Sequence, residues 1–527
     1  MAGFRICFIF VILLCFFSGR ASSVRLEAKS RWIVDEESGG RVKLACVNLI
    51  SHLEHMVTEG LNRQPISYIA STVASQGFNC VRLTWATFMV TKPENQKLTV
   101  ASSMSALNLS DAVAQISVSN PDFLELSLLD SLKRVAQGLG EAGLMVILDN
   151  HVSKPQWCCG LNDGNGFFGD QYFDAQEWIQ GWKIIAAEFK DVDAVVGMSL
   201  RNELRGPGSN PSDWYKYMQA AAEAVNAANP HVLVILSGLN YDADLKFLAS
   251  KPVNLGFPNK IVYEMHWYAF TDGNAWMQSN TNQLCGSVTA RINDHIAFVV
   301  KNDTDAPLFI SEFGIDERGT NVKDNRFINC FLAFAAAGDY EWALWTLQGS
   351  YYLRNGQTDL EETYGIFNGR WDGLRNPDFL SRLKSIQQPF QDPFSSQEIL
   401  YQAIYHPASG NCLAVVAGEV KLESCDSSAL FTFKTSEGAL GLSEEASCIT
   451  AQGDDQPAAL STLCTKPDSA WRTVSSSKLQ IAVNGSSELL CLDGSSSPQV
   501  LTKKCKDDDP EMQWFKVIQT DRKQSDG

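Results

Sequence analysis

The sequence predicts an α/β fold, a (β/α)8 TIM barrel, followed by an all-β domain, and three observations lead to this fold class. Eight short apolar segments rich in β-branched residues alternate with helical patterns between residues 42 and 347. Most of these segments follow one another at about the length of one βα unit. Beyond residue 396 the helical periodicity stops, and three similar cysteine-containing blocks follow. Alternating strands and helices are typical of a parallel sheet, and eight units over roughly 300 residues fit a closed barrel.

The predicted strands are apolar almost throughout, which suits strands covered on both faces. They are the segments 42–50, 78–85, 144–151, 195–203, 232–238, 261–268, 308–314 and 340–347. Helices are expected over 176–190, 212–229, 324–337 and 377–386. We interpret a Ser/Asn-rich insertion from about residue 87 to 121 as a loop. A doubly wound open sheet is the alternative, but eight units are many for it and no Gly-rich phosphate-binding loop is found.

The first 23 residues are typical of a secretory signal peptide, with one Arg, a short apolar run and small residues before cleavage at Ala21 or Ser23. We therefore expect a secreted, extracellular protein of the cell wall or apoplast, without a membrane anchor. Glycosylation triplets begin at Asn108, Asn302 and Asn484. The formal net charge of −17 argues against nucleic acid or an anionic membrane as a partner. A neutral ligand and a monomeric protein are expected.

A composition change near residue 388 indicates a domain boundary. We assign residues 24–388 to the barrel, 389–398 to a linker, 399–519 to the second domain and 520–527 to a tail. Cysteines within each block of the second domain are 13, 16 and 14 residues apart, and an aromatic residue trails each pair. This pattern resembles the β-trefoil of ricin-B-type lectins. The expected disulfides are Cys412–Cys425, Cys448–Cys464 and Cys491–Cys505.

Sugar-binding repeats of that lectin family usually carry an Asp just after the first cysteine. Only the third block keeps it, as Asp493, while the others have Ala414 and Thr450. Asp493 is therefore the possible lectin site, and a purely structural domain is the alternative.

Polar residues interrupt the predicted barrel strands near their carboxyl ends. Glutamate is almost never buried without a partner, yet Glu203 and Glu312 each lie at the end of an apolar run. The carboxyl ends of barrel strands line one mouth, where reacting groups gather. Two carboxylates facing each other there suit glycoside hydrolysis, in which one carboxyl is protonated and the other ionised.

The segments "VRLTW", "DNH", "LRNE", "EMHWY", "ISEFG" and "ALWTL", in this order, resemble glycoside hydrolase family 5, and more narrowly its plant cellulase-like members with a ricin-B-type C-terminal domain. The resemblance implies a retaining mechanism on a β-linked sugar, with Glu203 as general acid/base and Glu312 as nucleophile. It also implies substrate-binding or supporting roles for Arg82, His151, Asn202, His266, Tyr268 and Trp345. Arg82 and Tyr268 would hold Glu312, Asn202 would bind the sugar 2-hydroxyl, and Trp345 would form the stacking floor.

The expected substrate is a β-linked cell-wall polysaccharide or oligosaccharide, cleaved by an endo-β-glucanase-like enzyme. A β-mannan or other hemicellulose hydrolase or transglycosylase is one alternative, and a non-catalytic glycan-binding protein is another. We expect no cofactor and no metal, since the pair His52 and His55 lacks a third ligand.

Six cysteines of the barrel region are left without an assigned partner. Cys46 and Cys80 lie in apolar runs, where buried thiols are one interpretation, and the pairing of these two and of Cys158, Cys159, Cys285 and Cys330 stays open. Trp157 is either a substrate platform or a loop-packing residue.

Overall fold

The computed structural model describes residues 24–300, 306–391, 401–426, 431–434, 438–442 and 447–521. The predicted signal peptide, the linker from residue 392 on, the end of the tail and the Asn302 triplet lie outside the described residues. Among the described residues, no helix is both long and apolar enough to cross a membrane.

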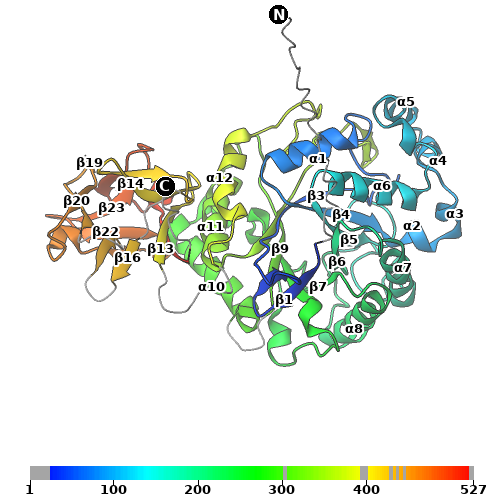
Figure 1. Cartoon of the computed structure of the whole chain (residues 1–527), viewed down its shortest axis with the longest axis horizontal. Coiled ribbons are helices and arrows are strands. Elements are labelled where there is room, and N and C mark those ends of the chain that lie inside the picture. Colours follow the sequence, from blue (N-terminus) through cyan, green and yellow to red (C-terminus); the bar gives the residue numbers. More distant parts are fainter. Residues whose placement is uncertain are drawn as a thin grey trace, which may run out of the picture.

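Eight parallel strands close into a barrel, which confirms the predicted architecture (Figure 1). The strand order around the barrel is β10-β3-β4-β5-β6-β7-β8-β9. The strands are β3 (Ala45–Leu49), β4 (Cys80–Ala86), β5 (Met145–Val152), β6 (Val195–Ser199), β7 (Leu233–Ser237), β8 (Ile261–His266), β9 (Leu308–Phe313) and β10 (Glu341–Leu344). Every one of them falls within a segment predicted as a strand, apart from a residue or so at the ends of β4 and β5.

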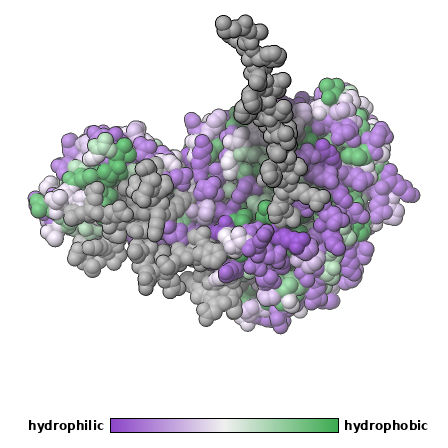
Figure 2. Space-filling model, viewed as in Figure 1, coloured by the Kyte–Doolittle hydropathy of each residue, from purple (hydrophilic) through white to green (hydrophobic). Residues whose placement is uncertain are grey.

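Helices surround the barrel and pack their apolar faces on it. They are α1 (Ile66–Ser75), α6 (Leu128–Glu141), α7 (Ala175–Glu188), α8 (Pro211–Ala228), α9 (Ala275–Gln278), α10 (Thr281–Val300), α11 (Val322–Gly338) and α12 (Pro377–Gln387). The four helices expected from the sequence correspond to α7, α8, α11 and α12. The face of the barrel seen in Figure 2 is largely hydrophilic outside the grey regions.

The interpretation of residues 87–121 as a loop was wrong. This insertion forms α2 (Thr87–Thr91), α3 (Pro93–Gln96), α4 (Val100–Ala106), α5 (Ser110–Ser119) and the start of the 3-10 turn η1 (Pro121–Phe123). Thr99 caps α4, because its side chain accepts from the Ser102 backbone while the Ser102 hydroxyl accepts from the Thr99 backbone. Met104 and Ile116 are fully buried. Local capping and burial therefore order a stretch whose composition is typical of a loop.

A short hairpin, β1 (Leu26–Lys29) and β2 (Trp32–Asp35), precedes the barrel. Leu26 and Ile33 pack in one buried cluster with barrel residues such as Cys46 and Ile147. The part of the barrel interior on the side of this hairpin is thus filled by apolar side chains. The polar groups are concentrated nearer the other end of the barrel. Within this apolar cluster Cys46 forms a disulfide with Cys80, so of the two open interpretations the structure has the paired one and not buried thiols. The cysteines face each other directly across β3 and β4.

The described residues between 401 and 521 form a β-rich part with an apolar core of its own. Among the described residues one sheet has the order β15-β14-β13-β16-β17-β18-β20, with β25 also paired to β13, and a second has the order β19-β24-β23-β22-β21. The strands are β13 (Tyr401–His406), β14 (Asn411–Val416), β15 (Glu419–Glu423), β16 (Phe431–Lys434), β17 (Ala439–Leu442), β18 (Cys448–Thr450), β19 (Gln456–Pro457), β20 (Ala459–Ser461), β21 (Arg472–Val474), β22 (Gln480–Asn484), β23 (Leu489–Asp493), β24 (Leu501–Lys504) and β25 (Lys516–Thr520). The three disulfides expected here are formed.

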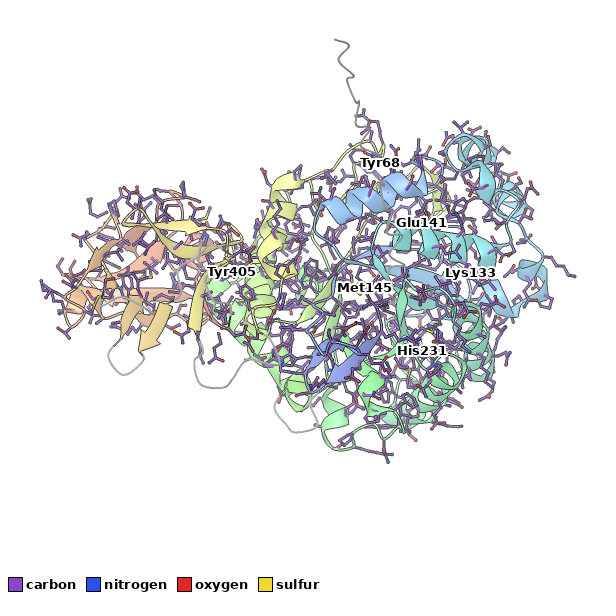
Figure 3. All side chains as sticks on the ribbon, in the orientation of Figure 1. Tyr68, Lys133, Glu141, Met145, His231 and Tyr405 are labelled. Atoms are coloured by element: carbon purple, nitrogen blue, oxygen red, sulfur yellow. A yellow bond between two sulfur atoms is a disulfide. The ribbon has the colours of Figure 1, made fainter. Side chains whose placement is uncertain are left out.

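This β part is docked on α10, α11 and α12 of the barrel (Figure 1). Tyr405, labelled in Figure 3, and Trp514 belong to the same apolar cluster as the helices. The buried amide of Asn282 on α10 accepts from the Trp514 indole at 2.9 Å and donates to Gln480 at 3.2 Å. The contact is therefore a continuous packed interface with buried hydrogen bonds.

Candidate active site

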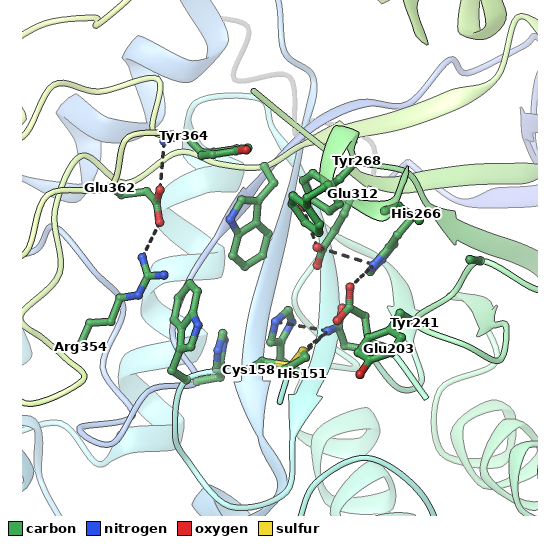
Figure 4. Close-up of a pocket in the computed structure, with 18 of the residues that line it drawn as sticks. His151, Cys158, Glu203, Tyr241, His266, Tyr268, Glu312, Arg354, Glu362 and Tyr364 are labelled. Atoms are coloured by element: carbon green, nitrogen blue, oxygen red, sulfur yellow. Dashed lines mark hydrogen bonds and ion pairs between the residues drawn. A yellow bond between two sulfur atoms is a disulfide. The ribbon is translucent and has the colours of Figure 1, made fainter. Parts of the chain in front are cut away.

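A cleft of about 800 Å³ opens at the carboxyl ends of the barrel strands (Figure 4). All of the cleft residues predicted from the sequence except Arg82 line it directly, and Arg82 lies beneath it. The lining residues include His52, His151, Trp157, Cys158, Cys159, Asn202, Glu203, Tyr241, His266, Tyr268, Glu312, Trp345, Arg354, Glu362 and Tyr364.

Glu203 lies just beyond β6, where the chain turns sharply. Its φ of 47° is in the left-handed region, which non-glycine residues seldom adopt. The backbone N–H of Glu203 donates to Asp242 Oδ2 at 2.9 Å, which fixes this turn. Asp242 reaches that position because Asn240, Tyr241 and Asp242 itself also have positive φ values, of 54°, 59° and 57°. Such conformations concentrate at functional sites.

Glu312 approaches from the end of β9. The pairing of β8 with β9 shifts register between Met265 and His266, so β9 carries one extra residue and His266 faces Glu312. As a result both Ser311 and Glu312 come within reach of the His266 ring. A bulge of this kind re-aims side chains beside active sites.

The two glutamates converge on His266. Its Nδ1 atom lies 3.1 Å from Glu203 Oε1 and 3.7 Å from Glu312 Oε2. One oxygen of each carboxyl and this nitrogen all lie within 4.8 Å of one another. Figure 4 shows both carboxyl groups turned toward the same ring.

The partners of the two carboxyls differ. Glu312 accepts from Arg82 Nη1 at 2.9 Å and from the Tyr268 hydroxyl at 2.9 Å. Glu203 has His266 as its hydrogen-bond partner among the described side chains. Burial raises the pKa of each glutamate from its ordinary value of 4.5 to about 7. Since Glu312 has two direct donors, it holds the negative charge when the pair shares one proton, and Glu203 holds the proton.

Arg82 is fully buried at the centre of a ring of acids. Its Nη2 atom lies 2.9 Å from Asp149 and 3.7 Å from Glu264, whereas Glu312 contacts Nη1. Burial alone would lower the pKa of this guanidinium, but the surrounding carboxylates, Asp149 first, raise it above its ordinary value. Arg82 is therefore a permanent positive charge under the cleft.

Asp149 and Glu264 were missed by the sequence reasoning, although a signal was present. Each lies two residues before a predicted cleft histidine, at the same side of its strand, since side chains alternate along a strand. Burial raises the pKa of both carboxyls. Each is also a carboxylate inside an apolar run, which is the feature that singled out Glu312.

Asn202 and His151 form the next layer of the cleft. Arg82 Nη2 donates to Asn202 Oδ1 at 3.0 Å, which leaves the Asn202 NH2 group 3.4 Å from His151 Nε2. Because an amide nitrogen only donates, His151 Nε2 accepts and Nδ1 carries the proton, 2.6 Å from Asp149. The His151 ring is stacked between Trp345, at 5.6 Å, and His52, at 4.0 Å. This stacking holds the half-buried Trp345 ring in place beside the two glutamates.

Among the described residues, two groups of cleft side chains have the donors for a metal ion: Glu203 with His266 and Glu312, and His151 with Cys158 and Cys159. The hydrogen bonds described above already engage the first group. The sulfurs of the second are bonded to each other.

Comparison with known proteins identifies the family. Residues 47–350 match cellulase (glycosyl hydrolase family 5). A glycosyl hydrolase 5 family protein of Chamaecyparis obtusa is 48% identical, over 97% of this chain and 96% of the relative. The chain belongs to glycosyl hydrolase family 5. It is a cellulase-like glycoside hydrolase.

More distant relatives carry explicit activities in their names. An endoglucanase of Paenibacillus polymyxa is 23% identical over 55% of this chain and 70% of its own length. The major extracellular endoglucanase of Xanthomonas campestris is 26% identical over 66% of this chain and 68% of its own. An endocellulase of Pyrococcus horikoshii, solved with cellotetraose, superposes with a TM-score of 0.56 at 20% identity, over 70% of this chain and 100% of that one. At that identity the likeness shows the fold.

Three further side chains lie in different parts of the molecule. Trp157 lines the cleft, with the Arg354 guanidinium 3.4 Å over its ring. Asn48 is buried and accepts from Arg82 at 3.0 Å. Asp493 is 2% exposed, and its carboxylate accepts from Ser495 and Gln513 of its own repeat.

Proposed function

We propose that this family 5 chain is a secreted, retaining β-glycoside hydrolase that acts on a β-glucan of the cell wall, with Glu312 as nucleophile and Glu203 as general acid/base. The observation that carries the proposal is the approach of the two carboxyls, whose nearest oxygens lie within 4.8 Å. Retaining enzymes hold their carboxyls about 5–5.5 Å apart, whereas inverting enzymes need about 6.5–9.5 Å to admit a water molecule.

In the first step Glu312 attacks the anomeric carbon and Glu203 donates its proton to the departing glycosidic oxygen. Arg82 and Tyr268 keep Glu312 ionised through their hydrogen bonds. Burial raises the pKa of Glu203 to about 7, so a large fraction of it holds its proton up to neutral pH. The environments of the two acids thus differ in the way that the reaction requires.

In the second step Glu203 takes a proton from water, and that water releases the sugar from Glu312 with net retention. His266, beside Glu203, supports its change from acid to base. Asn202 binds the 2-hydroxyl through its NH2 group, an interaction that strengthens as positive charge develops at the anomeric carbon. Trp345 is the floor on which the sugar stacks.

Product stereochemistry tests the mechanism. Glu203→Ala and Glu312→Ala each lose most turnover on cello-oligosaccharides, while Glu361→Ala, a control in the same cleft whose carboxylate pairs with Arg375, stays close to the parent. With an activated aryl β-glycoside and azide, Glu203→Ala yields the β-glycosyl azide and Glu312→Ala the α-anomer. Normal turnover in either glutamate variant contradicts the assignment.

The substrate class within β-glycans is proposed from the endoglucanase and endocellulase names of the relatives. A panel of cellulose, mixed-linkage glucan, β-mannan and xylan, with product identification, separates a glucanase from a hemicellulose hydrolase or transglycosylase. Equal or greater rates on mannan than on glucan reject the glucanase.

Two further proposals concern the ends of the chain. Residues 1–23 act as a signal peptide, supported by their composition and by six disulfides in the remaining chain. Residues 399–519 form a ricin-B-type β-trefoil, supported by three local cysteine pairs in an all-β setting. Mass analysis of the secreted protein's N-terminus tests the first proposal, and an experimental structure of the whole chain tests the second.

A further inference from the structure

Two adjacent cysteines are bonded to each other at the wall of the cleft. Cys158 and Cys159 form a disulfide, and both line the cleft. Cys158 is 7% exposed and packs against Ala86 and Val152, at the ends of β4 and β5. Cys159 is half-buried. The disulfide is thus anchored to the barrel on one side and open to the cleft on the other.

The residue before the disulfide is also fixed. Arg354 lies over the Trp157 ring and donates to Glu362 Oε2 at 2.9 Å, a pair drawn in Figure 4, so the carboxylate fixes the cation that covers the ring. The loop that carries the disulfide is therefore held from both sides.

The disulfide faces the amide of Asn202. The Asn202 Nδ2 atom lies 3.5 Å from Cys159 Sγ and 3.7 Å from Cys158 Sγ. Its oxygen is already fixed by Arg82, so the amide cannot turn over without losing that hydrogen bond. A bonded sulfur carries no hydrogen and accepts only weakly. One N–H of Asn202 donates to His151 Nε2, so the second N–H faces the sulfurs, which fix its direction but compete only weakly for it and leave it for the sugar hydroxyl.

We propose that the Cys158–Cys159 disulfide is a positioning element that keeps the Asn202 amide aimed at the sugar hydroxyl. The inference rests on the proposed function, which gives Asn202 a substrate contact. Two separate thiols would have S–H donors and independent rotamers, so the amide would lose its fixed, donor-free neighbour. Breaking the disulfide lowers turnover through Asn202.

The test is a cycle of variants of the full chain, with hydrolysis of an aryl β-cellobioside as the readout. The double variant Cys158→Ala/Cys159→Ala loses about tenfold in kcat/KM, the size expected for one hydrogen bond to a reacting sugar. When Asn202→Ala is already present, the same double change costs less than twofold, because its target is gone. If the fold-losses in kcat/KM of the cysteine double variant and of Asn202→Ala multiply in full when the changes are combined, the proposal is overturned. It is also overturned if the cysteine double variant keeps a kcat/KM within twofold of the parent.

A matched control separates positioning from simple stabilisation. Cys285→Ala/Cys330→Ala removes a disulfide that joins α10 to α11, away from the cleft. It lowers Tm and leaves kcat/KM unchanged below the transition. A double variant at 158 and 159 that behaves like this control contradicts the positioning role.

A second measurement avoids mutation altogether. A water-soluble phosphine reduces the disulfide to two thiols. The phosphine is itself oxidised to the phosphine oxide, with its oxygen taken from one water molecule. Activity of the treated parent is assayed first, and quenched aliquots are then alkylated and mapped by mass. Activity falls in step with labelling of Cys158 and Cys159, while Cys46 and Cys80, fully buried, stay unlabelled. Full activity with both cleft cysteines labelled overturns the inference alone, whereas a parent without glycosidase activity overturns the proposed function and the inference with it.

Discussion

At the scale of single residues, the sharing of protons between the two cleft glutamates decides the chemistry. Glu312 must be ionised and Glu203 protonated for the first step. The pair therefore gives a bell-shaped pH dependence of kcat/KM, whose basic limb falls as the pH rises above about 7, where Glu203 loses its proton. The acidic limb reports protonation of Glu312.

Tyr268→Phe tests which carboxyl gives the acidic limb. The variant removes the hydroxyl that donates to Glu312 Oε2, so the pKa of Glu312 rises. A hydrogen bond to a charged group contributes about 1.5–3 kcal/mol, so the acidic limb moves up by about one to two pH units. Tyr364→Phe is the control, because its hydroxyl lines the same cleft but donates to Asp324. A pH profile that moves equally in both variants contradicts the assignment of the nucleophile.

The raised pKa of Glu203 predicts a cost in stability that depends on pH. The folded-state pKa of Glu203, about 7, is above its ordinary value of 4.5, so its contribution to stability is fully present below about 4.5 and is lost as the pH rises to 7. Glu203→Gln removes this titration. The variant matches the parent near pH 4 and is more stable by about 3 kcal/mol at pH 8. Tm measured across this range checks it; a gap that does not widen with pH refutes it.

At the scale of elements, the barrel strands could be predicted because they are buried on both faces and read as apolar runs. The insertion could not, since its helices are short and α5 carries only two buried residues, Ala112 and Ile116. The two main carboxylates were predictable as exceptions in apolar runs. Asp242 was not, because its role depends on three consecutive left-handed residues after β7.

Thr99→Ala tests the capping that orders this insertion. The Thr99 side chain accepts from the Ser102 backbone at 3.2 Å, and loss of such a cap costs about 1 kcal/mol. Amide hydrogen exchange in α4 then speeds up about fivefold, since 1.4 kcal/mol corresponds to a factor of about ten. Ser105→Ala, at an exposed position of the same helix, changes it little. Unchanged exchange in Thr99→Ala means that packing alone holds α4.

At the scale of the whole molecule, the question is whether the C-terminal β part is a tethered module or a fixed wall of the barrel. Its Trp514 packs in the apolar cluster of the barrel helices, and the buried Asn282 amide joins the two parts. Gly410 lies against the backbone of Arg382, where a Cβ would come within 2.4 Å. Such close backbone approach is typical of one packed unit.

Gly286→Ala decides between these two descriptions. Gly286 lies within α10, and a Cβ there would meet the Ser476 carbonyl oxygen at 2.3 Å. In a free helix the change to Ala is favourable by about 1 kcal/mol. Against a fixed wall, overpacking costs about 1–3 kcal/mol and outweighs that gain. A fixed interface therefore gives a lower Tm in Gly286→Ala, whereas a loosely tethered module gives a higher one.

Ser287→Ala is the control, at the exposed residue next to Gly286 in the same helix. This change gains helix propensity without the clash. Its Tm is therefore the reference against which the sign of the Gly286 effect is judged.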